Sequence, residues 1–208
     1  MKTTLLLCAV GFASFAFSGK AMSQSLITTL VEISPNVPVN GSVDGSFFQN
    51  YPSGTLVFTD FQAFCVEPGQ GLSYGQTLTF DLQNPGDLVN SVAISKLVGG
   101  FLASGGTALD AAAVQWAIWE VVAELSPTRS VTEGNVILSP SSPSNPDGDA
   151  VATLANQYLA NIDTFAPASL YYLTHPDYQN VVTWTIPEPG SAALAALSAL
   201  VLLRRRRR

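Results

Sequence analysis

Positively charged residues are nearly absent from most of this 208-residue chain. Residues 24–186 contain two of them, Lys96 and Arg129, against fourteen Asp and Glu residues, so this stretch has a net charge of −12. A surface with that charge repels nucleic acids and anionic lipids. The composition therefore argues against a nucleic-acid partner. The other seven cations lie at the two ends of the chain.

Cysteine and histidine are equally scarce. The chain has Cys8, Cys65 and a single histidine, His175. Since we expect Cys8 to be removed with a leader, one cysteine remains and an internal disulfide is excluded. A lone cysteine with a lone histidine is a weak signal for a hydrolase, so we do not expect an enzyme. We also expect no metal or cofactor, because segment 145–149 lacks the last acidic position of a calcium loop and is better interpreted as a turn.

The N-terminal residues have the three parts of a secretory signal peptide. Met1 and Lys2 form a charged start, residues 5–17 are apolar, and Ala21-Met22-Ser23 is a small-residue cleavage site. We therefore expect residues 1–23 to direct export through the Sec machinery and to be removed by signal peptidase. The mature protein would begin near Gln24.

The C-terminal residues combine a short motif, an apolar stretch and an arginine cluster. The motif is Pro187-Glu188-Pro189-Gly190, the stretch is 191–203, and the cluster is Arg204, Arg205, Arg206, Arg207 and Arg208. A helix over the stretch would be ~20 Å long, whereas the hydrocarbon of a bilayer is ~30 Å thick. We therefore expect a transient insertion, with the arginines held on the cytoplasmic side.

This order of parts closely resembles the PEP-CTERM sorting signal of Gram-negative bacteria. The resemblance covers 187–208 and implies recognition of the Pro-Glu-Pro tripeptide by an exosortase, a membrane cysteine transpeptidase. It also implies that the protein ends at the cell-envelope surface or outside the cell. A plain tail anchor would explain the helix and the arginines but not the tripeptide.

Residues 24–186 are long enough for one domain with its own core. In the first part of the domain, short apolar segments separated by Pro, Gly, Asn and Asp predict strands. Apolar residues at helical spacing then predict helices, and two further strands are expected at the end of the domain. The fold class expected is α+β, an antiparallel sheet or partial barrel with an inserted segment of two to three helices. The expected strands are 26–33, 55–67, 78–82, 170–173 and 181–186, and the expected helices are 91–102, 111–124 and about 149–162, the last with Asp149 as its cap.

Two residues inside this domain carry the candidate chemistry. Cys65 stands near the end of a predicted strand, and Gln115 lies on the helix face that carries Ile118 and Trp119, which we expect to be buried. A buried amide must find hydrogen-bond partners, because each unpaired group costs about 1 to 3 kcal/mol. Either Gln115 ties down the backbone of a neighbouring strand, or Cys65 attacks its side-chain carbonyl, releases ammonia and leaves a thioester.

The motifs around these residues resemble the thioester domain of Gram-positive surface adhesins. One motif runs from Phe64 through Cys65 to Glu67, and the other contains Gln115, Trp116, Ile118 and Trp119. The resemblance implies a crosslink that acylates an amine or hydroxyl of a surface partner. The family usually has a smaller or more polar residue at the position of Trp116, where an indole could cover the bond or belong to the core.

Two functions of different class therefore remain open. The first is covalent attachment through a Cys65–Gln115 thioester, as in an adhesin or a matrix crosslinker. The second is a non-catalytic structural or binding component of the extracellular polysaccharide matrix or biofilm. For the first, Glu67 and Glu120 are candidate neighbours of the reacting groups, whereas His175 is better interpreted as a solvated turn residue.

Overall fold

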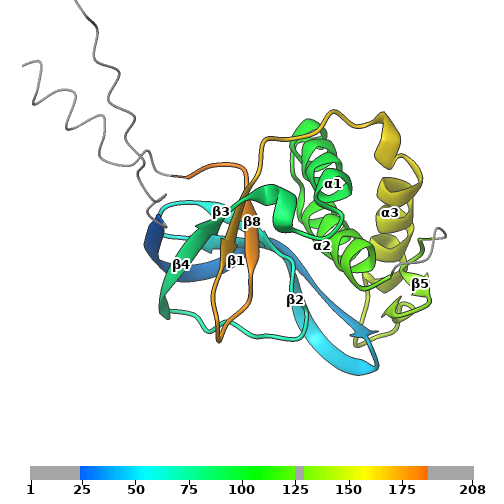
Figure 1. Ribbon diagram of the computed structural model, residues 1–208. Helices are drawn as coiled ribbons and strands as arrows, with labels where there is room; N and C mark the ends of the chain where they lie inside the picture. Colours follow the sequence, from blue (N-terminus) through cyan, green and yellow to red (C-terminus); the bar gives the residue numbers. More distant parts are fainter. Residues whose placement is uncertain (1–23, 125–128, 187–208) are drawn as a thin grey trace, which may run out of the picture.

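The computed structural model describes residues 24–124 and 129–186. The expected signal peptide and the PEP-CTERM-like tail lie outside these residues. The described part has an eight-stranded antiparallel sheet and three α-helices that gather on one side of it (Figure 1). This arrangement confirms the predicted α+β fold. None of the helices in these two stretches is long and apolar enough to span a bilayer.

Strands precede and follow the helices along the chain, and two short strands between the second and third helices were not predicted from the sequence. The strands are β1 (Ser25–Val43), β2 (Ser46–Phe58), β3 (Gln62–Cys65), β4 (Thr77–Gln83), β5 (Thr132–Glu133), β6 (Val136–Leu138), β7 (Tyr171–Thr174) and β8 (Val181–Thr183). The helices are α1 (Ser91–Ser104), α2 (Ala108–Ala123) and α3 (Gly148–Ala160), with short 3-10 turns η1 (Pro85–Asp87) and η2 (Ile162–Thr164).

The long strand β1 bends the sheet into a partial ring. Its first residues pair with β4, and from Leu30 onward it pairs with β2. Because the sheet order is β2-β3-β8-β7-β4-β1, the additional β1–β2 pairing joins the two ends of this series. Strands β6 and β5 extend the sheet from the far end of β1. The result is the partial barrel that the strand pattern predicts.

The first hairpin is much longer than the sequence pattern predicts. Strand β1 continues ten residues past the expected end at Ile33, and the expected strand 55–67 is divided into β2 and β3 by a turn. Proline interrupts the alternation of side chains here, yet Pro38 pairs with Pro52 across the hairpin. An extended backbone accepts the fixed φ of proline, and the register stays continuous from Val37 to Val39 across this pair.

Helix α2 forms the centre of the core. Its N-terminus is fixed by a capping box, in which Asp110 N donates to Thr107 Oγ1 and Thr107 N donates to Asp110 Oδ2, each at 3.2 Å. The expected burial of the face with Gln115, Ile118 and Trp119 is confirmed, and burial extends to every residue from Ala111 to Val121. The reason is that α2 contacts α1 and α3 as well as β1, β2 and β3.

Close packing against the sheet requires a glycine on β1. A Cβ built on Gly41 would lie 2.4 Å from Trp116 Cη2 and 2.7 Å from the carbonyl oxygen of Ile137. A side chain at this position would therefore push the helix off the strand. The small residues Ala111, Ala112 and Ala113 likewise let neighbouring elements approach the helix closely.

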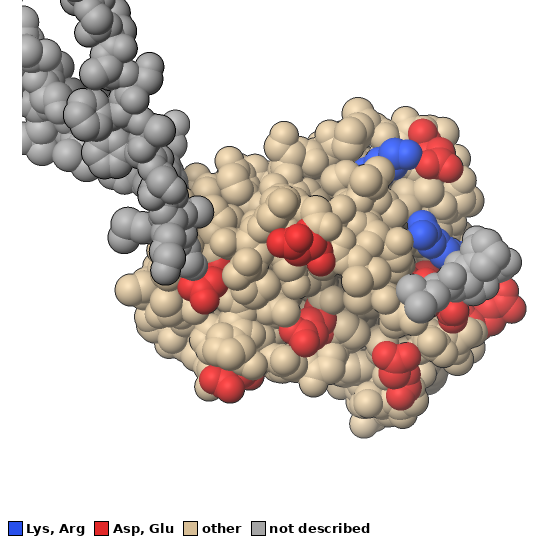
Figure 2. Space-filling view, in the orientation of Figure 1, with Lys and Arg blue, Asp and Glu red and all other residues tan. Residues whose placement is uncertain are grey.

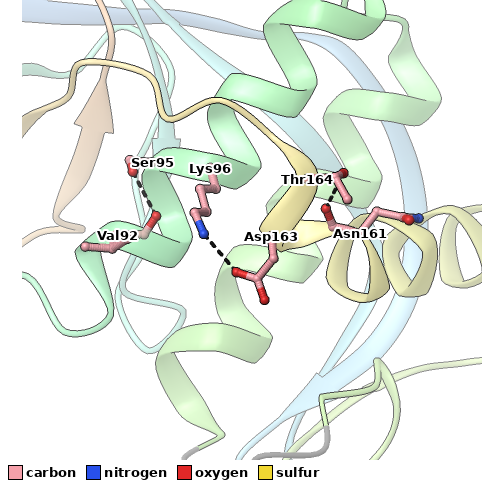
Figure 3. A network of polar contacts seen from close by, with 6 residues as sticks. All are labelled: Val92, Ser95, Lys96, Asn161, Asp163 and Thr164. Carbon is pink, nitrogen blue, oxygen red and sulfur yellow. Dashed lines mark hydrogen bonds and ion pairs between the residues drawn. The ribbon is translucent and has the colours of Figure 1, made fainter.

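A glycine cap and polar contacts fix the two outer helices, α1 and α3. Helix α1 stops at Gly105, which has a φ of +88° and forms the left-handed C-cap. Lys96 Nζ on α1 lies 2.8 Å from Asp163 Oδ1 in η2 (Figure 3). The predicted capping role of Asp149 is wrong, because α3 begins at Gly148 and Asp149 Oδ1 instead accepts from Ser141 N.

Charge is spread unevenly over the described surface. In the face shown in Figure 2, acidic side chains lie over both the sheet and the helical side, whereas basic side chains lie over the helical side. The two cations of the domain are Lys96 on α1 and Arg129, which follows α2. The sheet side of the domain is therefore acidic and carries no basic residue within 24–124 or 129–186.

Candidate functional site: a buried cysteine and glutamine

Cys65 is the last residue of β3, an inner strand of the sheet. It pairs with Val181 of β8, and its side chain is 2 % exposed. On the other side of β3, pairing with β2 involves Gln62 and Ala63 and does not extend to Cys65. The backbone N–H and C=O of Cys65 therefore need partners other than β2.

Gln115 supplies both of these partners from the middle of α2. Cys65 N donates to Gln115 Oε1 at 2.9 Å, and Gln115 Nε2 donates to the carbonyl oxygen of Cys65 at 2.9 Å. The amide of Gln115, itself 2 % exposed, thus continues the edge of β3 in place of a strand. The structure brings the two residues predicted from the sequence into direct contact.

The sulfur of Cys65 lies among N–H groups. Glu67 N donates to Sγ at 3.3 Å, and Trp119 Nε1, one helical turn after Gln115, donates to it at 3.4 Å. The carboxamide of Gln179, from the loop between β7 and β8, also interacts with the sulfur. These groups lower the pKa of the thiol, but complete burial outweighs them and raises it to about 12.

Aromatic rings close the site on the side of β2. Tyr51 and Phe48 pack against the indole of Trp119, with ring centroids 5.7 and 5.9 Å away. Burial raises the pKa of the Tyr51 phenol to about 12, and Gln179 interacts with its hydroxyl. The thiol is therefore shielded from water by groups that themselves stay neutral at physiological pH.

The remaining motif residues belong to the core around the site. Phe64 packs edge-to-face on Phe101 at 5.1 Å, and Ile118 is fully buried. Trp116 donates from Nε1 to Ser53 Oγ at 2.8 Å. Of the two roles open to Trp116, the structure therefore shows the core role.

The three candidate acid–base residues are placed differently. Glu67 borders the site, where its carboxylate accepts from Gln70 Nε2 and from Asn180 N. Glu120 contacts another part of the fold and accepts from Ser130 N at 2.8 Å. His175 packs against Phe80 and Tyr178, and its Nδ1 accepts from Asp177 N, so its contacts are with its own turn and with β4.

Tyr51 and Gln179 are the site residues that the sequence analysis missed. Gln179 is buried and its Nε2 donates to the carbonyl oxygen of Glu67 at 3.2 Å. Both residues come from segments without an apolar period, so no local pattern indicates that Gln179 is buried or that the half-buried Tyr51 packs at the site. The Asp44-Gly45 pair, with φ values of +48° and +78°, was a usable hairpin signal that would have placed Tyr51 on a strand.

In segment 145–149, the side chain of Asn145 connects the turn to β1 and to the residues that follow β6. This fully buried side chain accepts from Asn40 N at 3.0 Å and donates to the carbonyl oxygens of Ser139 and Pro140. Its amide is thus used by the protein backbone, as a turn requires. Within 24–124 and 129–186, no group of three or more His, Cys, Asp and Glu side chains is arranged to hold a metal ion.

Comparisons with protein-family models, with curated proteins and with solved structures found no match to this chain. Arguments about function therefore rest on the geometry of the site and on the sequence motifs.

Proposed function

We propose that the protein is exported and forms an internal thioester between Cys65 Sγ and the side-chain carbon Cδ of Gln115, through which it attaches covalently to a partner. The observation that carries this proposal is the two-point hydrogen bond between the Gln115 amide and the backbone of Cys65. This contact holds the amide next to the residue that bears the nucleophile. It also places an N–H on Oε1, the oxygen that becomes negative when a thiolate attacks Cδ.

Formation of the bond needs no further reactant. Cys65 loses its thiol proton, its sulfur attacks Cδ, and the electron pair of the carbonyl moves to Oε1, where Cys65 N donates. The tetrahedral carbon then re-forms its carbonyl and expels Nε2, which leaves as ammonia with the proton that the thiol gave up. The products are a thioester and one ammonia, and burial protects the thioester from hydrolysis.

Attachment to a partner breaks the carbon–sulfur bond of the thioester and restores the S–H bond of Cys65. An amine or hydroxyl of the partner attacks Cδ, the carbon–sulfur bond breaks, and Cys65 recovers a proton as a free thiol. The partner stays joined to Gln115 by an amide or ester. Each molecule acts once, so the protein is a covalent adhesin or matrix crosslinker and not an enzyme.

An intact mass tests the thioester directly. Purified 24–186 should be lighter than its sequence by one ammonia, and methylamine should add to it with the appearance of one titratable thiol. Cys65→Ala is the matched control, because it keeps the backbone groups that bond to Gln115 and should show the full mass. A full mass and a free thiol in the unsubstituted protein would remove the proposal.

A second function is favoured by the same contact if that mass is full. Gln115 would then be the structural tie that holds β3 to α2, and both ends of its amide are already satisfied in that role. The protein would then be a passive component of the extracellular polysaccharide matrix. In this protein acidic residues outnumber basic ones fourteen to two between 24 and 186.

The sorting part of the proposal rests on 187–208, which lies outside the described residues. It is supported by the end of the last strand at Thr183, which leaves three residues before the Pro-Glu-Pro motif. We propose processing by an exosortase-like transpeptidase after transient insertion in the inner membrane. Replacing Glu188 with Ala, or deleting Arg204–Arg208, should leave unprocessed protein in the cell envelope. Normal release of both variants would contradict this part alone.

A further inference from the structure

We infer that Trp119 takes part in the thioester chemistry, because its Nε1 and the Glu67 N–H both donate to Cys65 Sγ and form a thiolate-stabilising site. We call these two N–H donors the thiolate site. The inference rests on the proposed function and adds residues to it. It assigns to the site the chemistry of the sulfur, whereas the Cys65 N–H serves the carbonyl oxygen.

The donors reach the sulfur from two separate parts of the chain. Trp119 Nε1 comes from α2 at 3.4 Å, and Glu67 N comes from the segment after β3 at 3.3 Å. The Glu67 segment is held in place by Gln179, whose Nε2 donates to the Glu67 carbonyl oxygen. Trp119 is held by Phe48 and Tyr51, which pack against its ring.

The convergence is unsuited to a resting thiol. A neutral thiol is a weak donor and a weak acceptor, so N–H groups aimed at it gain little in a buried site. A thiolate is a charged acceptor, and hydrogen bonds to charged groups are much stronger than neutral ones. The thiolate site is therefore complementary to the sulfur at the two moments when it carries negative charge, namely attack on Gln115 and departure from it.

Other charged and titratable groups near the sulfur act in the opposite direction. The Glu67 carboxylate raises the pKa of the thiol, and the Tyr51 phenol faces the same sulfur from β2. No Lys or Arg contributes, since Lys96 contacts Asp163 and Arg129 interacts with Glu120 and Asp163. Stabilisation of the thiolate thus depends on neutral N–H donors alone among the described residues.

The role of the thiolate site in opening can be written as a balanced step. A partner amine bonds to Gln115 Cδ, and the carbon–sulfur electron pair moves onto Sγ while Trp119 Nε1 and the Glu67 N–H donate to it. The proton that the amine loses ends on the sulfur. The products are a Gln115-linked amide and the Cys65 thiol, so no oxidant, reductant or metal is needed.

Two tryptophans on α2 provide a matched pair of variants. Trp119→Phe removes an indole N–H that points at Sγ, whereas Trp116→Phe removes one that points at Ser53 Oγ. Both variants replace a buried indole with a phenyl ring, and the two tryptophans lie one and four positions after Gln115. We expect methylamine to open the thioester of Trp119→Phe about tenfold more slowly and that of Trp116→Phe at nearly the original rate.

A second measurement works even where the thioester does not form. In the Gln115→Leu background Cys65 is a free thiol, and its rate of modification by methyl methanethiolsulfonate at pH 8 reports the thiolate fraction. Loss of the Trp119 donor should slow this modification several-fold relative to Trp116→Phe. A purely structural role predicts the opposite sign, because a loosened core exposes the sulfur and speeds the reaction.

These outcomes separate the two proposals. Faster modification, or equal rates for the two tryptophan variants in both assays, overturns the thiolate site while leaving the thioester intact. A full mass of the unsubstituted protein overturns the thioester, and the modification rates then still decide whether the N–H groups stabilise a thiolate. Circular dichroism of each variant confirms that the rates refer to folded protein.

Discussion

Helix α2 carries two buried polar side chains whose hydrogen bonding is very different. Gln115 is bonded at both ends of its amide to the backbone of Cys65. Glu120, five positions later and 0 % exposed, accepts from Ser130 N with one oxygen, while Oε2 has no partner within the described residues. A neutral amide matches an adjacent donor and acceptor on a strand, whereas a carboxylate can use only donors. Hydrogen bonds therefore compensate the burial of the Gln115 amide, whereas the burial of the Glu120 carboxylate lowers the free energy of unfolding.

The pKa of Glu120 expresses that cost. Its pKa is raised from 4.5 to about 7, mainly by burial and to a lesser extent by the carboxylates of Glu124 and Glu133, while the Ser130 N–H and Arg129 oppose the increase. The folded protein therefore binds a proton at Glu120 more tightly than the unfolded chain does. Its contribution favours folding below about pH 4.5, is lost as the pH rises to about 7, and stays lost above that.

The largest expected effect comes from removing the amide of Gln115. In the Cys65→Ala background, where no thioester can form, Gln115→Leu leaves a buried N–H and a buried C=O unpaired. We expect the free energy of unfolding to fall by about 2 to 5 kcal/mol, and by a similar amount at pH 5 and pH 8, as measured in urea. Gln115→Glu should lose less at pH 5, because a carboxyl still accepts from residue 65. An unchanged stability would show that the two-point contact is dispensable.

A smaller effect of opposite sign is expected at the other side chain. Glu120→Gln removes the charge that burial penalises, so the variant should be more stable than the original protein by about 1 to 3 kcal/mol at pH 8 and show little gain near pH 4.5. Urea denaturation across this range measures the difference. Glu32→Gln is the control, since it removes the same charge from an exposed position on β1. Parallel pH profiles for all three proteins would contradict the assigned burial cost.

The smallest effect on stability is expected from removing the solvent-exposed charge of Asp163. Asp163 pairs with Lys96 at the surface, and its side chain is 90 % exposed. Because solvent screens such a pair, Asp163→Asn should not measurably change the melting temperature. Thermal unfolding at low salt tests this, and a clear decrease would mean that η2 depends on the ion pair.

The sequence predicted the helices and the contact between Cys65 and Gln115 better than it predicted the first hairpin. Apolar spacing found α1 and α2 to within three residues at each end, since their packing follows the helical period. The early hairpin was missed because prolines and glycines hide the alternation of side chains in β1 and β2. Cys65 and Gln115 were identified by short motifs, but Tyr51 and Gln179 reach the sulfur only through the pairing of β1 with β2 and of β3 with β8.

The position of β8 between β3 and β7 has a mechanical consequence. If the protein is tethered beyond residue 186 and joined to a partner at Gln115, tension runs along residues 115–186 and leaves the segment from Cys65 to Gln115 slack. The hydrogen bonds that hold the three residues of β8 to β3 and β7 then lie in series with the covalent bond at Gln115 and bear the same tension. Because hydrogen bonds are far weaker, this short strand would be pulled away from the sheet before the attachment breaks.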